Sequence, residues 1–516
     1  MADTPSAIAH GSFFRHARNY LLGSAAAGVI GFLTVSVLTR LLTKEEYGVL
    51  KVFLSVVTIF GVLVELNLRG AVNRYYLEET DDFPSFLKSV LLFLGAFTVF
   101  NVTWAWFLRG PLGAFLELDP TLAFLAVLLA ITLVPWNLNW KLMGARLQSA
   151  QFSALRVFRD AVVLGVGAAW ILSIPGTDHG LGGREYGMVW GTLAVNGAFA
   201  AYLIIKLWRT ARPGPFDKRH LRYALAFGVP LVPHALSGFL LATFDRVIIQ
   251  QLEGEASAGL YSFAYDVGAV MQMVVVAMNQ AWLPIFTLLR NRERHAQIHR
   301  TATTYSQVLV AVALVIVLFG HELAYLLGGD RFSEALPIIP IVVMSYVALF
   351  MYNVYANHSF YLRRSGLISL ATLLAGTVNV VLNYALIPEY GYAVAAWTTL
   401  GSYLLMFAGH YAVARWVLRE PVTPVLPILG WFLLGCAASA GIVLAEDAID
   451  DLVLTFFAVK LPALAILGTW ALRAYKLARA RGRADELAEQ ADALAAETTA
   501  ELTPETEPAT NRENNT

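Results

Sequence analysis

The sequence predicts an all-α polytopic membrane protein with about fourteen transmembrane helices. Of its 516 residues, 57% are hydrophobic and only 14% are charged, and the mean hydropathy is +0.60. Soluble proteins carry about 25% charged residues, and their surfaces still have to meet water. The single cysteine, Cys436, excludes a disulfide scaffold, and the net charge of zero argues against a nucleic-acid partner.

The hydrophobic stretches have the length of membrane-spanning helices. A bilayer core of about 30 Å requires about 20 apolar helical residues, and the short alternating segments of a barrel do not occur. Pro230, Pro233 and Pro284 predict bends in the seventh and eighth stretches. The predicted spans are 19–42, 46–68, 86–108, 120–142, 152–173, 186–207, 223–251, 257–288, 302–327, 334–361, 366–387, 391–416, 424–445 and 453–475.

The basic residues predict the orientation of these spans. An even number of spans places both termini on one side, and most of the 37 Lys and Arg residues fall in the segments on that side. The last segment on the opposite side, residues 446–451, is acidic and has no base. The positive-inside rule therefore predicts a cell-membrane protein, inner or plasma, with both termini in the cytoplasm.

The segment between the sixth and seventh spans predicts two lobes. It contains Pro213 and Pro215 together with several bases, and six spans precede it. Two lobes of six helices each would be related by an axis along the membrane normal. The expected organisation is a cytoplasmic N-terminus at 1–18, an N-lobe at 19–207, an inter-lobe loop at 208–222, a C-lobe at 223–416, two further spans within 417–475 and a largely disordered cytoplasmic tail at 476–516.

Several short motifs resemble a known family. They are residues 38–48 (LTRLLTKEEYG), 68–76 (LRGAVNRYY), 227–234 (FGVPLVPH), 245–249 (DRVII), 259–261 (GLY) and 279–284 (NQAWLP). Their order and spacing resemble the polysaccharide transporter family, the Wzx-type flippases of the multidrug/oligosaccharidyl-lipid/polysaccharide exporter superfamily. The similarity extends over residues 12–416. At Arg69 this chain departs from the Leu-Gly that is usual after the second span, which adds a base there.

The resemblance implies a flippase for polysaccharide synthesis. It implies two lobes around a central cavity that move a polyprenyl-diphosphate-linked oligosaccharide from the inner to the outer leaflet by alternating access. Membrane lipids and other polysaccharide-assembly proteins are the remaining candidate partners, and H⁺ or Na⁺ is the candidate coupling ion. We expect no cofactor and no metal, since the sequence contains neither a Walker A motif nor a complete HExxH zinc motif.

Three other functions fit parts of the sequence. A drug/cation antiporter of the same superfamily usually has twelve spans, so the two extra spans count against it. A membrane-embedded polymerase or glycosyltransferase should have a large extracytoplasmic loop, whereas the longest such segment here is only about 173–185. A scaffold that recruits partners through its acidic tail would depend on residues 484–516.

Charged residues within spans are costly in lipid and therefore mark candidate sites. Asp245 and Arg246 are expected to line the cavity, with Arg246 binding an anionic head group or pairing with Asp266; the alternative is a purely structural ion pair. Asp266 is otherwise a protonatable group for ion coupling or a neutral buried acid. Arg40, at the end of the first span, is either a second cavity residue or a snorkelling anchor.

The remaining candidates lie near the ends of the second and eighth spans. Glu65 can reach Arg69 along one helix face, and it is also a candidate for ion coupling. Arg74 is placed to bind diphosphate at the inner mouth, although it also contributes to the positive-inside charge. Asn279 and Gln280 follow Asp266 by about four helical turns, which predicts a polar cavity wall on this helix.

Overall fold

The computed structural model describes residues 10–78, 82–174, 183–362, 364–449 and 452–470, together with 472, 473 and 476. Helices form the regular structure of these segments, and no strand occurs in them. The predicted acidic tail lies outside the described residues, apart from residue 476. Contacts divide the chain into a larger unit that ends at Ala440 and a smaller one that begins at Gly441.

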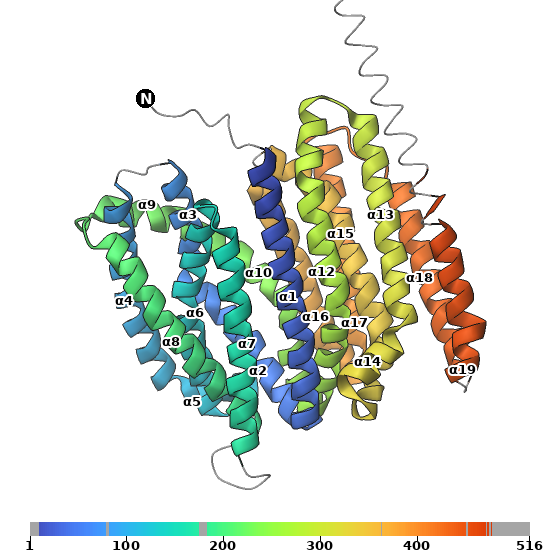
Figure 1. Ribbon diagram of the computed structural model, residues 1–516, viewed down its shortest axis with the longest axis horizontal. Coiled ribbons are helices and arrows are strands. Elements are labelled where there is room, and N and C mark those ends of the chain that lie inside the picture. Colours follow the sequence, from blue (N-terminus) through green and yellow to red (C-terminus); the bar gives the residue numbers. More distant parts are fainter. Residues whose placement is uncertain are drawn as a thin grey trace, which may run out of the picture. The chain divides into compact units, whose positions relative to one another are not determined.

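The first half of the larger unit comprises residues 10–228. Its long helices run roughly parallel to one another in Figure 1. Within it, α2 packs on α6, α6 on α8, and α7 on both α1 and α8. The helices are α1 (His10–Leu41), α2 (Lys44–Glu65), α3 (Leu68–Glu78), α4 (Phe83–Phe107), α5 (Arg109–Leu116), α6 (Pro120–Ala145), α7 (Ser149–Ser173), α8 (Glu185–Ala211) and α9 (Lys218–Gly228).

The second half begins at Val229. In it α15 packs on α12 and α17, and α16 packs on α10 and α17. We call the end of the helices at which α1 begins the proximal end, and the end at which α2 begins the distal end. The helices are α10 (Val232–Thr243), α11 (Asp245–Glu253), α12 (Glu255–Asn291), α13 (His295–Leu318), α14 (Gly320–Gly328), α15 (Ile339–Tyr361), α16 (Ser365–Tyr390), α17 (Val394–Ala412) and α18 (Val425–Asp447), which continues into the second unit.

The smaller unit contains the end of α18 and the last described helix. That helix begins as α19 (Leu452–Thr455) and continues through a π-helical turn at Phe456–Lys460. The Lys460 side chain is 1% exposed and lies 3.2 Å from a carboxylate oxygen of Glu446. This buried base, which has no obvious partner in the sequence, is therefore neutralised from the preceding helix.

The predicted all-helical architecture is confirmed, because a helix occupies each of the fourteen predicted segments. In the described part of the chain, eleven helices are long and apolar enough to cross a membrane, judged by length and composition alone. The fifth segment, α7, contains too many charged residues to be counted, namely Arg156, Arg159 and Asp160. The twelfth, α17, is not apolar enough, because it is rich in polar side chains. The fourteenth contains a shorter apolar helix, Phe456–Trp470.

The seventh predicted span is interrupted rather than continuous. A 3₁₀ turn at Val229–Leu231 separates α9 from α10, and α11 begins directly after α10. Pro230 and Pro233 cannot donate backbone hydrogen bonds, which explains the break and confirms the bend predicted there. Pro284, by contrast, lies inside α12, which continues without interruption to Asn291.

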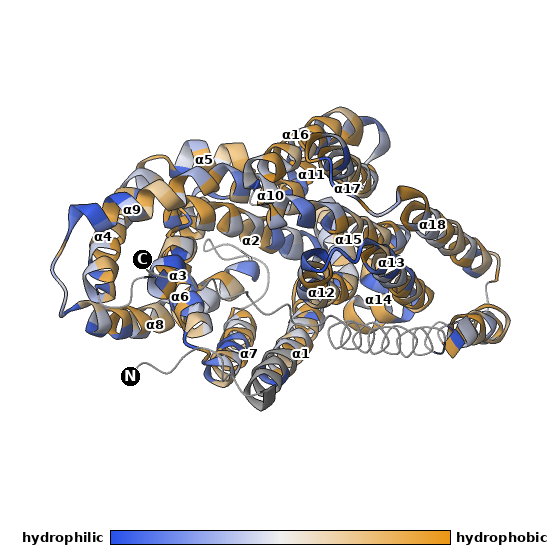
Figure 2. Cartoon of the chain, turned by 90° about the horizontal axis from the view of Figure 1, so that it is seen from above, coloured by the Kyte–Doolittle hydropathy of each residue, from blue (hydrophilic) through white to orange (hydrophobic). Residues whose placement is uncertain are grey.

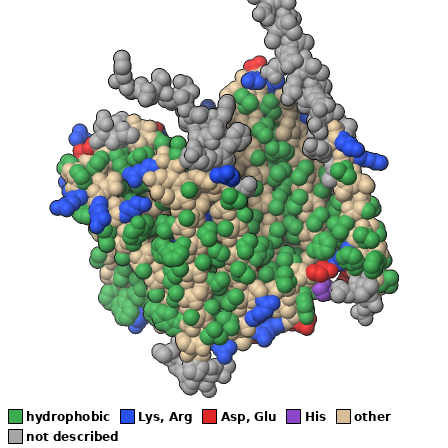
Figure 3. Space-filling view, viewed as in Figure 1, with side chains coloured by type: hydrophobic (Ala, Val, Ile, Leu, Met, Phe, Trp, Pro, Cys, Tyr) green, Lys and Arg blue, Asp and Glu red, His purple; other side chains and the backbone are tan. Residues whose placement is uncertain are grey.

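Apolar side chains dominate the outward surface of the helices. Figure 2 shows hydrophobic residues along the outer faces of many helices. In Figure 3 one face of the molecule is largely covered by hydrophobic side chains, while Lys and Arg gather near its upper left and lower edges. This distribution is what a lipid environment requires of a helical protein, because apolar side chains meet the acyl chains and bases meet the head groups.

Candidate substrate path between the two halves

Two glycines bring α2 and α12 into backbone contact at the distal end. Gly48 and Gly259 are each the fifth residue of their helix. A Cβ atom on Gly48 would overlap the carbonyl oxygen of Glu255, and one on Gly259 would overlap that of Lys44. Each glycine thus meets the residue four positions before the other, which is the reciprocity expected of elements related by a two-fold axis.

Local sequence fixes where both helices start. At α2, the Thr43 side chain accepts a hydrogen bond from the Glu46 amide, while the Glu46 carboxylate accepts one from the Thr43 amide. This capping box satisfies two amides that the first turn would otherwise leave free. At α12, Gly254 precedes the helix with φ +88°, a conformation that glycine adopts at little cost. These starts place Gly48 and Gly259 at the same level.

One turn further along α2, an ion pair joins the two halves. Lys51 Nζ lies 2.7 Å from Asp266 Oδ2 on α12, and the Tyr47 hydroxyl donates to the same oxygen. The two side chains are only 17% and 22% exposed. The acid that the sequence offered as a partner for Arg246 or as a proton carrier is therefore held by a base from the other half.

The Asp245–Arg246 pair is buried and self-contained. Asp245 is fully buried and accepts hydrogen bonds from the Tyr261 hydroxyl and the Arg246 amide. Arg246 Nη1 lies 3.3 Å from Asp245 Oδ1, and its guanidinium lies 5.0 Å from the ring centre of Tyr265. The burial of this pair means that its charges are offset by each other and by aromatic faces rather than by water.

Further hydrogen bonds join the halves at the distal end. Arg40 donates to the carbonyl oxygen of Leu326 on α14 at 2.9 Å, so this candidate cavity residue fastens α1 to the second half. Lys44 Nζ lies 2.6 Å from a carboxylate oxygen of Glu334, and Arg331 donates to the carbonyl oxygen of Leu42 at 3.1 Å. The distal end is therefore closed by side chains as well as by the glycine contact.

Glu65 lies at the proximal end of α2, where the chain changes direction. Leu66 and Asn67 adopt left-handed conformations with φ 50° and 54°, which separate α2 from α3. The 2% exposed Glu65 carboxylate accepts a hydrogen bond from the Arg69 amide at 3.3 Å and lies 3.5 Å from the Arg69 guanidinium. Asn137 on α6 donates to its other oxygen at 2.8 Å. The predicted Glu65–Arg69 contact is thus present, and the carboxylate also caps α3.

Arg74 is exposed on α3 and faces α9, the last helix of the first half. Its Nε lies 2.8 Å from Glu78 Oε1, and its guanidinium lies 5.4 Å from the ring centre of Phe227 on α9. The hydrogen bond from Arg74 lowers the pKa of the Glu78 carboxyl below its ordinary value. Nearby, a Cβ atom on Gly228 would come within 2.6 Å of the carbonyl oxygen of Leu66, so two motifs of the sequence meet here.

Asn279 and Gln280 lie on the half of α12 that is least covered. Residues 258–265, toward the distal end, are buried, whereas Met273, Val276 and Gln280 are exposed. The side-chain oxygen of Asn279 is buried and has no hydrogen-bond partner among the described residues. Fewer side chains of α12 are therefore buried in its proximal half, although Trp282 and Phe286 are, and the predicted polar positions fall in this more accessible part.

Sequence reasoning did not select Lys51 or Tyr47 as site residues. The signal was available, because Lys51 is a base within a strongly apolar span, but its partner lies 215 positions away in the other half. A second missed cluster lies at the proximal end, where Glu420 is held by Arg290 at 3.0 Å and by His358 at 3.3 Å. In the described residues, no group of three or more His, Cys, Asp or Glu is arranged to hold a metal.

Two helical halves meet in reciprocal contact, and the mostly buried ion pair of Lys51 and Asp266 lies between them, an arrangement typical of a polytopic membrane protein of the transporter class. The family model described as "Polysaccharide biosynthesis protein" matches residues 17–290, more than half of the chain. The chain belongs to this family. The resemblance seen in the sequence motifs is thereby confirmed.

Curated relatives cover most of the chain at low identity. "Lsg locus putative protein 1" of Haemophilus influenzae is 23% identical over 379 residues, which are 71% of this chain and 89% of the relative. "Probable low-salt glycan biosynthesis flippase Agl15" of Haloferax volcanii is 21% identical over 394 residues, which are 74% of this chain and 79% of the relative.

Solved structures share the fold. "Lipid II flippase MurJ, inward closed conformation" superposes with a TM-score of 0.67 at 12% identity and covers 88% of this chain and 98% of its own. An inward-facing multidrug resistance MATE family transporter gives a TM-score of 0.54 at 12% identity, covering 82% of this chain and 98% of its own. The fold is therefore shared by flippases and drug transporters, and the family match places the chain in polysaccharide biosynthesis.

Proposed function

We propose that this chain moves a polyprenyl-diphosphate-linked oligosaccharide from the cytoplasmic to the outer leaflet of the cell membrane, without chemical conversion of the substrate. The observation that supports this most directly is the closed interface between α2 and α12, the seam between the two halves, in a chain of the polysaccharide biosynthesis family. The names of the relatives support the same class, since one of them is a probable glycan biosynthesis flippase.

In this proposal the proximal end faces the cytoplasm, as the distribution of bases in the sequence indicates. The structure then corresponds to a state that is closed toward the outside. The contact of Gly48 with Gly259 and the pairs of Lys51 with Asp266 and Lys44 with Glu334 all close the distal end. Transport requires these contacts to break while others form at the proximal end.

The charged residues have distinct roles in this cycle. Arg74, exposed at the proximal end, receives the diphosphate, because a guanidinium can bind phosphate oxygens in pairs. Arg246 offers a second cation deeper in the seam once substrate competes with Asp245. Asn279 and Gln280 provide polar contacts for sugar on α12. Carrying diphosphate past such groups lowers the several kcal/mol that an unpaired charge costs in the membrane interior.

Asp266 is the favoured site of ion coupling in this scheme, and Glu65 is the alternative. Asp266 pairs across the seam, so protonation or Na⁺ binding there would release Lys51 and favour separation of the halves. Glu65 binds α3 and α6 within the first half, so its titration would act on the proximal end alone.

The first test reconstitutes the purified chain in liposomes and follows a fluorescent polyprenyl-diphosphate oligosaccharide between leaflets. We expect accelerated exchange, reduced at least about tenfold in Arg246→Ala and less in Arg74→Ala, at equal protein abundance. Absence of exchange with every polyprenyl-diphosphate sugar tried would reject the proposal. Drug-for-cation exchange in the same liposomes would instead identify an antiporter.

A second test locks the distal end. In a Cys436→Ser background, Lys44→Cys and Glu334→Cys are joined by a short bismaleimide, which should stop transport because the two residues belong to different halves. The matched control joins Arg290→Cys to Glu420→Cys, a pair of similar separation within the second half. Transport should survive the control crosslink, and equal inhibition by both would contradict alternating access at this seam.

A further inference from the structure

Helix α9 has two faces with different partners. One face, with Tyr223, Ala224 and Phe227, packs on α3 and α4: the Tyr223 ring lies 5.5 Å from Tyr75, and Ala224 is completely buried. The opposite face carries Leu221, Leu225 and Val229, which recur at helical spacing. An amphipathic surface helix would normally turn polar residues outward, so this second apolar face needs an explanation.

The packed face holds α9 firmly. Ser85 donates to the carbonyl oxygen of Pro215 at 2.9 Å, and the Asp217 amide donates to Ser89 at 2.9 Å. His220 lies 2.9 Å from the Asp82 carboxylate and 3.2 Å from the Tyr75 hydroxyl. These bonds hold residues 215–217 and the first turn of α9 against α3 and α4. The opposite face of α9 therefore belongs to a helix that is fixed in place.

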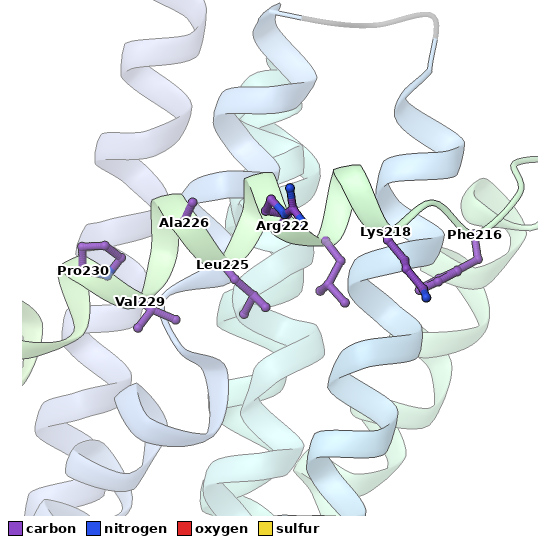
Figure 4. A pocket seen from close by; sticks show the side chains of 8 residues that line it. Phe216, Lys218, Arg222, Leu225, Ala226, Val229 and Pro230 are labelled. Atoms are coloured by element: carbon purple, nitrogen blue, oxygen red, sulfur yellow. The ribbon is translucent and has the colours of Figure 1, made fainter.

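A groove runs along the free face. Its cavity volume is about 730 Å³, within the range of roughly 300–1,000 Å³ typical of ligand sites, and its lining is mostly apolar. Figure 4 shows Leu225 and Val229 pointing to the same side of α9, and Lys218 and Phe216 converging at one end. Phe216 and Val229 are 45% and 44% exposed, so the apolar surface is open to an occupant.

Two bases border this groove without an acidic partner among the described residues. They are Lys218 and Arg222, both exposed and one helical turn apart. Their neighbour Arg219 differs, since its guanidinium lies 2.7 Å from the Asp217 carboxylate. The free face therefore combines an apolar groove with two positive charges that no acid in the described residues pairs, whereas the third base of the same turn is neutralised by Asp217.

We propose that this face binds an anionic phospholipid of the adjacent leaflet, with the phosphate on Lys218 and Arg222 and an acyl chain along Leu221, Leu225 and Val229. The chemistry follows from the position of α9, which packs against the first turns of α4 at the proximal end, as Figure 1 shows, where head groups and acyl chains meet. Bases on an amphipathic helix attract anionic lipid head groups, and apolar side chains beside them enter the acyl boundary. This site goes beyond the proposed transport function and does not require the transported substrate.

The test measures lipid binding to the full chain by native mass spectrometry, with phosphatidylglycerol and phosphatidylcholine of the same chain length. The test variant is Lys218→Gln/Arg222→Gln. The control variant is Arg209→Gln/Arg219→Gln, which loses the same charge at the same end of the molecule. We expect phosphatidylglycerol to bind the test variant roughly 10- to 30-fold more weakly than wild type, with the control changed less than about threefold.

A third variant examines the groove itself. Leu225→Gln should weaken long-chain phosphatidylglycerol while leaving a short-chain analogue unaffected, because only the acyl contact changes. Equal losses in the test and control variants would show general charge attraction and overturn the proposal, as would unchanged binding in the test variant. Displacement of phosphatidylglycerol from this face by polyprenyl diphosphate at lower concentration would make the transported lipid the occupant and also overturn it. Leaflet exchange is measured separately, so failure here leaves the transport proposal intact.

Discussion

The distal and proximal ends of the larger unit differ in which parts of the chain their polar contacts join. At the distal end, Lys51 with Asp266 and Lys44 with Glu334 connect the first half to the second. At the proximal end, Arg290 with Glu420 connects helix and loop within the second half, and His220 with Asp82 connects α9 to the start of α4 within the first half. One end is fastened across the seam, and the other stabilises each half separately.

This difference explains how a transporter can be stable yet able to rearrange. Contacts within a half survive a relative movement of the halves, whereas contacts across the seam are lost and must be replaced. Hinge and shear motions depend on such bistable interfaces between packed bodies. Substitutions at the distal end should therefore change the equilibrium between conformations, while those at the proximal end should change the stability of one half.

The largest effect is expected from Gly48→Ala. The added methyl group overlaps the carbonyl oxygen of Glu255, so the helices must separate or the closed state is lost. Overpacking of this kind costs roughly 1–3 kcal/mol. We expect a lower unfolding midpoint and a changed flipping rate, measured by thermal denaturation in detergent and by liposome exchange.

Gly61→Ala is the matched control on the same helix. In the described part of the chain, nothing beyond the adjacent residues and the local backbone of α2 lies within 4 Å of a Cβ built at Gly61, and alanine is a better helix former by about 1 kcal/mol. This variant should be as stable as the wild type or more so. If both substitutions had the same effect, the contact between α2 and α12 would not be what distinguishes the distal end.

A smaller effect is expected from the Lys51–Asp266 pair. Removing either side chain leaves a mostly buried charge without its partner, so each single alanine variant should be less stable than wild type. The double variant should then lose less stability than the sum of the two single losses. A double-mutant cycle should give a coupling free energy of roughly 0.5–3 kcal/mol. For the control cycle of Lys44 with Glu334, whose carboxylate is 63% exposed, about 0–1 kcal/mol is expected. Equal coupling in both cycles would contradict a special role for the buried pair.

Much of the fold could be predicted from the sequence because lipid imposes a simple requirement on length and hydropathy. Fourteen segments and the break at Pro230 follow from that requirement and from proline chemistry. Helix α9 could not be predicted in this way, because an apolar stripe mixed with bases can belong either to a loop or to an interfacial helix. Residue propensities also do not predict the left-handed turn at Leu66 and Asn67. This turn packs against Gly228 at the end of α9.

The candidate site was less predictable, because ion pairs in a bundle depend on how helices meet. Asp245, Arg246 and Asp266 could be selected as charges inside spans, yet the partner of Asp266 came from α2 rather than from the neighbouring Arg246. Arg40 was predicted as a second cavity residue or a snorkelling anchor, but its guanidinium bonds Ser36 on α1 and the Leu326 carbonyl on α14. One sequence reveals which charges are costly, and only the packing shows which of them neutralise each other.

The smallest effect, and the one that tests the proximal end, concerns pH and Glu420. Burial alone would raise the pKa of the Glu420 carboxyl, but the hydrogen bonds and charge of Arg290, together with His358, lower this pKa below its ordinary value. A carboxyl with a lowered folded-state pKa stabilises the fold above its unfolded pKa and loses that contribution as pH falls through the folded value. The unfolding midpoint of wild type should therefore fall more between about pH 5 and pH 3 than that of Glu420→Gln does.

The control is Glu293→Gln, which removes an exposed carboxyl next to α13 and should follow the wild-type profile. In Glu420→Gln itself, the crosslink and exchange assays should report unaltered distal closure. A pH profile of Glu420→Gln identical to that of wild type would show that Arg290 and Glu420 contribute nothing to the stability of the second half.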